Sequence, residues 1–224
     1  AVTTGTNNTV IGALAGDALT DAGNNVAVGE EALSLDTLGS RSVAVGANSL
    51  GNQNFTTATN GYNVAVGFDS GVAVTTGFQN TFVGANAGDG TDDGSYNTAI
   101  GYNALSANCG GQNTALGENS LAAATGATNT ALGAATGYGV TSGSNNCFVG
   151  QQAGRADSPG GNITTASNIL TLGNTAIATA NIQVDWTVAS DQRDKTDFTA
   201  LDLGLDFVKA LAPVTYKWDK RTQY

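Results

Sequence analysis

The chain has 224 residues, of which 31 are glycine and 2 are proline, and it has a formal net charge of −10 with no histidine. Nucleic acids and anionic membrane surfaces are bound through basic patches, so this charge disfavours both as partners. Histidine is the commonest metal ligand and general base, and its absence leads us to expect no cofactor and no metal site.

The start of the chain lacks the basic and apolar regions of a signal peptide, and no apolar run is long enough to span a bilayer. We therefore expect neither signal-directed secretion nor membrane insertion. Glycine does not recur at every third position, which excludes a collagen helix.

A five-residue unit recurs nine times, at intervals of 16, 17 or 21 residues. Each unit has Asn or Ser, then three mainly small or β-branched residues, then glycine. The nine glycines are Gly12, Gly29, Gly46, Gly67, Gly84, Gly101, Gly117, Gly133 and Gly150. A repeat of this length predicts a solenoid. We expect each coil to hold a three-residue strand, a glycine turn, a second short strand and a polar loop.

The residue types of the unit predict how neighbouring coils pack. Glycine supplies a corner with positive φ, or lets two backbones approach closely. Asparagine tolerates left-handed geometry, and stacked copies can form amide ladders. The central apolar residues are small, except Phe82 and Phe148. A coil with so little interior is expected to gain stability from stacking and from packing against identical chains about an axis.

The unit N-[TV]-[AVF]-[VIL]-G-x-x-[AST]-[LG] resembles the head repeat of trimeric autotransporter adhesins, and related repeats of phage fibres, over roughly residues 7–154. This resemblance implies an all-β fold: a left-handed parallel β-roll or β-solenoid of about nine to ten coils, assembled as a homotrimer. The period is somewhat longer than the usual adhesin repeat, which leaves the loop lengths and coil shape open. The calcium-binding G-G-x-G-x-D nonapeptide of other solenoids is absent.

The loops offer three candidate sites, each with a plainer interpretation that we favour. The 21-residue interval places an insertion at residues 51–60, which is either a tolerated outward loop or part of a binding face. Asp89, Asp92 and Asp93 could offer oxygens to calcium, but a solvated acidic turn is favoured. Inter-chain packing is preferred over stacking on surface sugars for a set of aromatic residues. These are Tyr62, Phe68, Phe78, Tyr102 and Tyr138.

The two cysteines, Cys109 and Cys147, are placed by the repeat two to three coils apart. That separation exceeds the Cα distance that a disulfide can bridge, so free thiols are expected.

After residue 154 the repeat gives way to other elements. Residues 155–161 are rich in turn formers, and residues 168–173 resemble a degenerate tenth coil. Alternating apolar residues predict a strand over 180–189, and apolar spacings of 4, 3 and 3 predict an amphipathic helix over 199–211. We therefore divide the chain into a solenoid (1–154), a segment with linker, tenth coil and terminal strand (155–189), and a C-terminal α+β segment (190–224).

The C-terminal segment begins with Ser190-Asp191-Gln192-Arg193-Asp194-Lys195, preceded by an aromatic-bearing strand. A lysine whose pKa is lowered by burial can activate a serine hydroxyl as a nucleophile. With the apolar residues that follow it, the segment resembles the start of the endosialidase-type intramolecular chaperone at the C-termini of phage tail fibres and tailspikes. That family's domain usually runs on for many tens of residues, so we expect only its beginning here.

The resemblance implies that the chaperone trimer folds the fibre and then cuts itself off before the serine. Carried over, the scissile bond is Ala189–Ser190, with Ser190 as nucleophile and Lys195 as general base. Asp191 and Arg193 match the motif in supporting or positioning roles. No activity in trans is expected, because acidic residues do not recur as the paired carboxylates that glycan hydrolysis needs.

Together these features predict a structural and host-recognition component of a bacteriophage tail fibre, trimerised and matured by a self-cleaving intramolecular chaperone. Its expected partners are copies of itself, other phage tail proteins and a host surface receptor, which could be a glycan. Its expected location is the virion, after assembly in the host cytoplasm. The alternative is a head fragment of a bacterial trimeric cell-surface adhesin.

Overall fold

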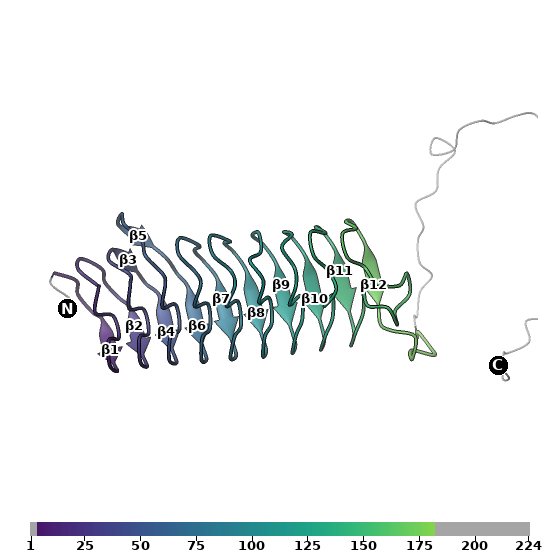
Figure 1. The fold of residues 1–224 in the computed structure, drawn as a ribbon, viewed down its shortest axis with the longest axis horizontal. Helices are drawn as coiled ribbons and strands as arrows, with labels where there is room; N and C mark the ends of the chain where they lie inside the picture. Colours follow the sequence, from purple (N-terminus) through teal and green to yellow (C-terminus); the bar gives the residue numbers. More distant parts are fainter. Residues whose placement is uncertain (1–3, 182–224) are drawn as a thin grey trace, which may run out of the picture. The chain divides into compact units, whose positions relative to one another are not determined.

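The computed structural model describes residues 4–181, which form a solenoid of stacked parallel strands (Figure 1). Ten three-residue strands join in chain order into one parallel sheet. They are β1 (Thr9–Ile11), β2 (Val26–Val28), β4 (Val43–Val45), β6 (Val64–Val66), β7 (Thr81–Val83), β8 (Thr98–Ile100), β9 (Thr114–Leu116), β10 (Thr130–Leu132), β11 (Cys147–Val149) and β12 (Leu170–Leu172). The described residues contain no helix. The predicted all-β parallel solenoid is confirmed, whereas its handedness and the trimer stay predictions.

Equivalent residues of the units pair with one another along the whole sheet. Ala27 pairs with Ala44, and Ala44 pairs with Ala65 across the 21-residue interval. The last strand, β12, pairs with β11, so the degenerate tenth coil is part of the same sheet. The compact unit that holds the solenoid ends at Ala180. The strand predicted over 180–189 and the helix predicted over 199–211 extend into or lie in the part of the chain outside the described residues.

The repeated glycines, called here the column glycines, are required for both predicted reasons. Gly12 to Gly133 have φ between 131° and 144°, a region that side chains rarely adopt. A Cβ on Gly29 would lie 2.5 Å from the carbonyl carbon of Gly46, because consecutive coils touch at this corner. The Gly46 N–H in turn donates to the Val28 carbonyl at 2.8 Å.

The residues after each column glycine form turns, so the prediction of a second short strand in each coil is wrong. The second and fourth residues after the glycine have left-handed φ, as in Asn48 (57°) and Leu50 (49°). These angles curl the backbone out of the extended conformation. The turns still stack, because the Asn48 N–H donates to Glu30 O at 2.8 Å and the Leu50 N–H to Ser70 O at 3.0 Å.

The predicted amide ladder is present at the start of the strands. The Asn80 N–H donates to Asn63 Oδ1 at 2.9 Å, and the Asn97 N–H donates to Asn80 Oδ1 at 2.9 Å. These side chains are buried, and the hydrogen bonds that their Oδ1 atoms accept offset part of the cost of removing an amide from water, although Asn97 Nδ2 is buried without a partner in the described residues. The left-handed residue is the one before the asparagine, as in Gln79 (φ 56°), and not the asparagine itself.

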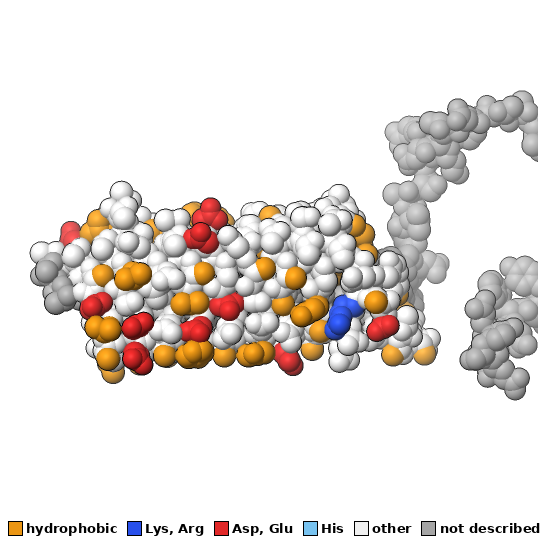
Figure 2. Space-filling model, viewed as in Figure 1, with side chains coloured by type: hydrophobic (Ala, Val, Ile, Leu, Met, Phe, Trp, Pro, Cys, Tyr) orange, Lys and Arg blue, Asp and Glu red, His pale blue; other side chains and the backbone are white. Residues whose placement is uncertain are grey.

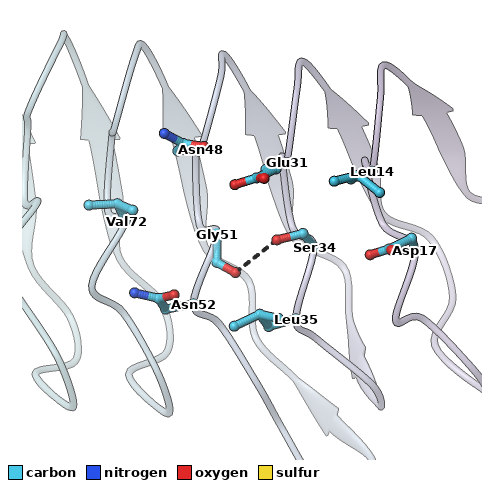
Figure 3. Close-up of a pocket in the computed structure, with 9 residues that line it drawn as sticks. All are labelled: Leu14, Asp17, Glu31, Ser34, Leu35, Asn48, Gly51, Asn52 and Val72. Atoms are coloured by element: carbon cyan, nitrogen blue, oxygen red, sulfur yellow. Dashed lines mark hydrogen bonds between the residues drawn. The ribbon is translucent and has the colours of Figure 1, made fainter.

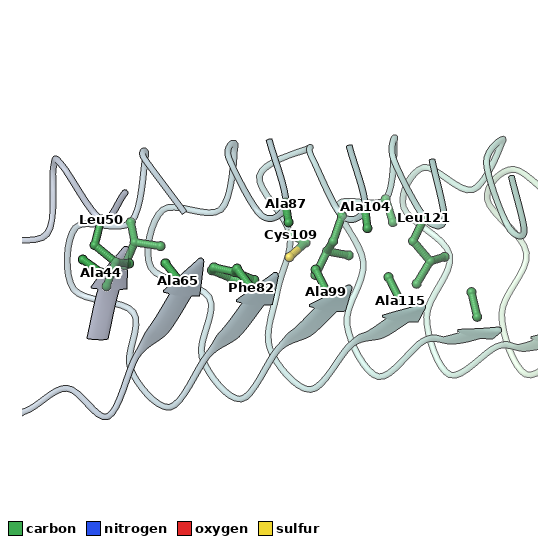
Figure 4. Close-up of a cluster of buried hydrophobic side chains, with 14 of the residues drawn as sticks. Ala44, Leu50, Ala65, Phe82, Ala87, Ala99, Ala104, Cys109, Ala115 and Leu121 are labelled. Atoms are coloured by element: carbon green, nitrogen blue, oxygen red, sulfur yellow. The ribbon is translucent and has the colours of Figure 1, made fainter. Parts of the chain in front are cut away.

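The core is filled by complementary side chains from strand and turn (Figure 4). In the coils of Ala44 and Ala99, for example, the central strand residue is alanine, and a leucine from the turn, Leu50 or Leu105, is buried in the core. Phe82 is also buried, but the equivalent turn residues around it are Gly71 and Gly88. A Cβ on Gly88 would lie 2.6 Å from the Phe82 ring, so the ring occupies space that leucine fills in other coils.

Candidate functional site

The predicted self-cleavage residues, Ser190 and Lys195 with Asp191 and Arg193, lie outside the described residues, as does the Ala189–Ser190 bond. The candidate sites that the structure does describe lie on the solenoid. They are a hollow in one of its faces, the 21-residue insertion, the acidic turn and the exposed aromatic residues.

One face of the solenoid is built from the six residues that follow each column glycine, and we call it the turn face. A hollow of about 390 Å³ lies in it, near the N-terminal end. Figure 3 shows that its lining residues come from successive coils as parallel rows. They are Leu14, Asp17, Glu31, Ser34, Leu35, Asn48, Gly51, Asn52 and Val72.

The chemistry of the hollow is mixed, with the carboxylates of Asp17 and Glu31 beside two exposed leucines. Ser34 Oγ donates to the Gly51 carbonyl at 3.2 Å, and Asn48 Nδ2 donates to Asp69 Oδ1 at 2.9 Å. Carboxylate and amide oxygens of this kind accept hydrogen bonds from hydroxyl groups. The sequence analysis missed the hollow, although Leu14, Glu31 and Asn48 all stand two residues after a column glycine.

The 21-residue insertion is only partly an outward loop. Residues 56–58 are exposed, and Figure 1 shows the short strand β5 (Thr59–Asn60) projecting from the stack beside β3 (Gly39–Ser40). Gln53 and Phe55, however, are buried. The prediction of a plain surface loop therefore misses the part of the insertion that fills the interior.

Gln53 belongs to a buried polar network around Asp36. Asp36 Oδ1 accepts from the N–H groups of Gly39 and Phe55, both at 3.0 Å, and Oδ2 accepts from Gln53 Nε2 at 2.6 Å. Burial raises the pKa of Asp36 above its ordinary value, and these hydrogen bonds partly oppose the shift.

The same glutamine supplies a side-chain amide at the point in the ladder where Ser42 stands in place of asparagine. Its Nε2 also donates to Ser42 Oγ at 3.3 Å, and its Oε1 accepts from Asn63 Nδ2 at 2.8 Å. The network thus joins the coils before and after the insertion.

The three aspartates considered for calcium are not gathered into a ligand set. No group of three or more Asp, Glu, Cys or His side chains that could hold a metal occurs among residues 4–181. Asp92 is hydrogen-bonded by the Thr75 hydroxyl. Asp89 is half-buried, and its pKa is raised by burial and by the charge of Asp69.

The exposed aromatic residues occupy repeated positions. Tyr62 precedes ladder residue Asn63, and its hydroxyl accepts from Arg41 Nη1 at 2.7 Å. Tyr96, which the sequence analysis did not single out, occupies the same position before Asn97. Its ring packs edge-on against Phe78, with centroids 5.2 Å apart. Tyr96 could have been identified from the sequence, because it directly precedes a ladder asparagine as Tyr62 does.

The two cysteines are free, as predicted. Cys109 is buried with its Sγ 3.4 Å from Thr91 Oγ1, and burial raises the pKa of its thiol. A thiol with a raised pKa is less often the reactive thiolate at neutral pH, so Cys109 acts as a packing residue.

Residues 190–223 match the family model described as the chaperone of endosialidase. This supports the chaperone-like nature of the C-terminal segment, which begins at Ser190. No curated protein and no solved structure matches the chain. Within residues 4–181 there is no helix that could cross a bilayer.

Proposed function

We propose that the chain belongs to a bacteriophage tail fibre, in which the solenoid is a rigid structural and host-contacting element and the segment from Ser190 begins an intramolecular chaperone. The observation that carries the proposal is the match of residues 190–223 to the chaperone of endosialidase, in a chain whose earlier residues form a ten-stranded solenoid. Many near-identical coils can pair out of register. A chaperone that aligns the chains at one end addresses this hazard.

Association of three chains is supported by the outer face of the sheet. The third residue of each strand is aliphatic and points out of the coil, so it forms a continuous row. The exposed members are Ile11 (61%), Val66 (37%), Val83 (36%), Ile100 (38%), Leu116 (42%), Leu132 (46%), Val149 (37%) and Leu172 (48%). None of the ten strands contains a charged residue, although the chain has 18 acidic ones. An apolar row of this length is typical of a surface that is covered by a partner.

A second copy of the chain is the partner whose own row has the same repeat along the axis. Three copies arranged about an axis would cover one another's rows. The proposed location is the virion, and the other proposed partners are tail proteins and a host surface receptor.

Maturation is proposed to proceed by attack of Ser190 Oγ on the Ala189 carbonyl, with Lys195 accepting the hydroxyl proton. The peptide bond breaks, the Ser190 amine leaves with a proton, and water hydrolyses the resulting ester to leave a carboxylate on Ala189. Asp191 and Arg193 are assigned supporting roles.

The test is the intact mass of the full-length protein after expression. Wild type is expected to yield a product that ends at Ala189, whereas Ser190→Ala and Lys195→Ala stay full length. Thr196→Ala, which removes a neighbouring hydroxyl, serves as the matched control and is expected to be cut. Wild type that forms a stable oligomer without shortening would remove the self-cleavage proposal.

The alternative, a head fragment of a bacterial trimeric adhesin, is supported by the repeat unit itself, which suits either setting. Such a protein would be anchored in an outer membrane and would not release its C-terminal segment. Surface labelling of the producing bacterium separates the two, because a virion component is found on phage particles.

A further inference from the structure

Two aromatic side chains stand in register on the rim of the turn face. Phe68 and Tyr102 each directly follow a column glycine, and Ala85 occupies the equivalent position in the coil between them. Backbone hydrogen bonds between coils hold this register. The Asn86 N–H donates to Phe68 O at 2.9 Å, and the Asn103 N–H donates to Ala85 O at 3.0 Å. Two coils correspond to roughly 10 Å along the axis of the solenoid.

Both rings are available to a ligand. Phe68 is 55% exposed and Tyr102 is 57% exposed. Neither contacts another ring or a cation in the described part of the chain, whereas Tyr62 lies under Arg41 and Tyr96 packs against Phe78. The alanine between the two rings leaves the space over the middle coil open.

A row of polar side chains runs beside the two rings. The residue after each rim position is Asp69, Asn86, Asn103 or Asn119, all with left-handed φ between 53° and 57°. Within the row, Asn103 Nδ2 donates to Asn119 Oδ1 at 3.0 Å. From Asp69 to Asn119 the row offers a carboxylate or amide acceptor at every coil, and amide donors at the three asparagines. The same row continues through Asn48 into the hollow of the turn face.

Rings with a parallel row of amides suit a carbohydrate. The C–H faces of sugar rings stack on aromatic side chains, while their hydroxyl groups need hydrogen-bond partners at the edge. The ring spacing is about the length of a disaccharide. Figure 2 shows acidic and hydrophobic side chains interspersed on the side of the solenoid in view, with basic ones confined to its C-terminal end. Residues 4–181 contain only Arg41 and Arg155 as basic residues. These charges disfavour an anionic sugar chain.

We propose that Phe68, Tyr102 and the amide row beside them bind a neutral linear glycan that lies along the solenoid axis, with alternate sugar rings on the two aromatic side chains. This rests on the proposed function and names the class of receptor that the solenoid contacts. It also revises the preference for inter-chain packing at these two residues.

The chain offers a matched control. Tyr62 and Tyr96 flank the same two strands, β6 and β8, at their opposite ends, also two coils apart. If aromatic rings at strand ends served only the association of copies, removal of either pair would weaken the oligomer. If Phe68 and Tyr102 bind glycan, only their removal affects glycan binding, and the oligomer persists.

The experiment is isothermal titration calorimetry of the full-length chain with neutral oligosaccharides of chitin, cellulose and mannan, and with oligogalacturonate as the anionic comparison. Wild type is expected to bind at least one neutral oligosaccharide, and to bind it more tightly than oligogalacturonate. The variant Phe68→Ala/Tyr102→Ala is expected to bind about tenfold more weakly or not at all. Tyr62→Ala/Tyr96→Ala is expected to bind as wild type does. Native mass spectrometry of each variant reports the number of chains.

Three results would overturn the proposal: wild type that binds none of the neutral oligosaccharides, equal loss of binding in both double variants, or a Phe68→Ala/Tyr102→Ala variant with altered chain number. None of these results bears on Ser190 cleavage, so the proposed fibre function stands or falls separately.

Discussion

At the level of single residues, equivalent positions of the repeat share their backbone geometry more strictly than they share a side-chain type. The sequence predicted the column glycines and the amide ladder, because each recurs at a fixed place in the unit. It did not predict left-handed φ at residues such as Leu50 and Asn48. Leucine rarely adopts this conformation and asparagine only tolerates it, so residue type alone does not predict it. The close stacking of coils imposes it.

The insertion was understood least well from sequence. Gln53 and Asp36 lie 17 residues apart in the chain and meet only because one coil stacks on the next. The polar composition of the insertion predicts a loop. No neighbouring residue in the sequence indicates that Gln53 takes the place of a ladder asparagine. Pairing information between coils is needed to find such a network.

Asp36 gives the solenoid a pH-dependent contribution to stability. Its pKa is raised in the folded state, so below the unfolded value of 3.8 both states are protonated and burial costs little. As pH rises from there through the folded pKa, the folded state must ionise a buried carboxyl, and the free energy of unfolding falls.

We therefore expect the stability of wild type relative to Asp36→Asn to decrease between about pH 4 and neutral pH, measured by urea unfolding. Asp21→Asn, at an exposed position, is the control. A wild-type protein that gains stability relative to Asp36→Asn over this range would contradict the expected direction.

At the level of one coil, the size of the core side chain on the strand is matched to the size of the core residue in the neighbouring turns. Leu50 and Leu105 fill the core from left-handed turn positions (φ 49° and 54°), and Gly88 holds the same position with φ 64° beside Phe82. The sequence showed that this turn position holds either leucine or glycine. It could not show that Gly71, Gly88, Gly137 and Gly154 lie against the ring of Phe82 or Phe148.

Substitution across this contact should be strongly non-additive. Phe82→Ala is expected to lower the free energy of unfolding by about 3–5 kcal/mol through the cavity it leaves. Gly88→Leu alone is expected to destabilise by collision with the ring. The double variant should recover part of both losses, because leucine then fills the space as Leu105 does. The check is a double-mutant cycle measured by chemical denaturation. Additive losses in the free energy of unfolding would show that the sizes of residues 82 and 88 are not coupled.

At the level of the whole molecule, the solenoid presents two different long surfaces. The sheet offers an uncharged aliphatic row, while the turn face offers aromatic, amide and carboxylate groups. The first is suited to copies of the chain and the second to a hydrophilic ligand. A stack of coils with one surface for copies of the chain and another for a ligand would meet the mechanical and adhesive needs of the proposed fibre.

The central claim, that the sheet's aliphatic row joins three chains, is tested most directly by native mass spectrometry of the full-length protein. Wild type is expected to contain three chains, and Ile100→Asp/Leu116→Asp, which places charges in the row on β8 and β9, is expected to be monomeric. Ala107→Asp/Ala123→Asp adds the same charges on the turn face of the same coils and is expected to remain a trimer. A monomeric wild type, or an Ile100→Asp/Leu116→Asp variant that keeps three chains, would contradict the account.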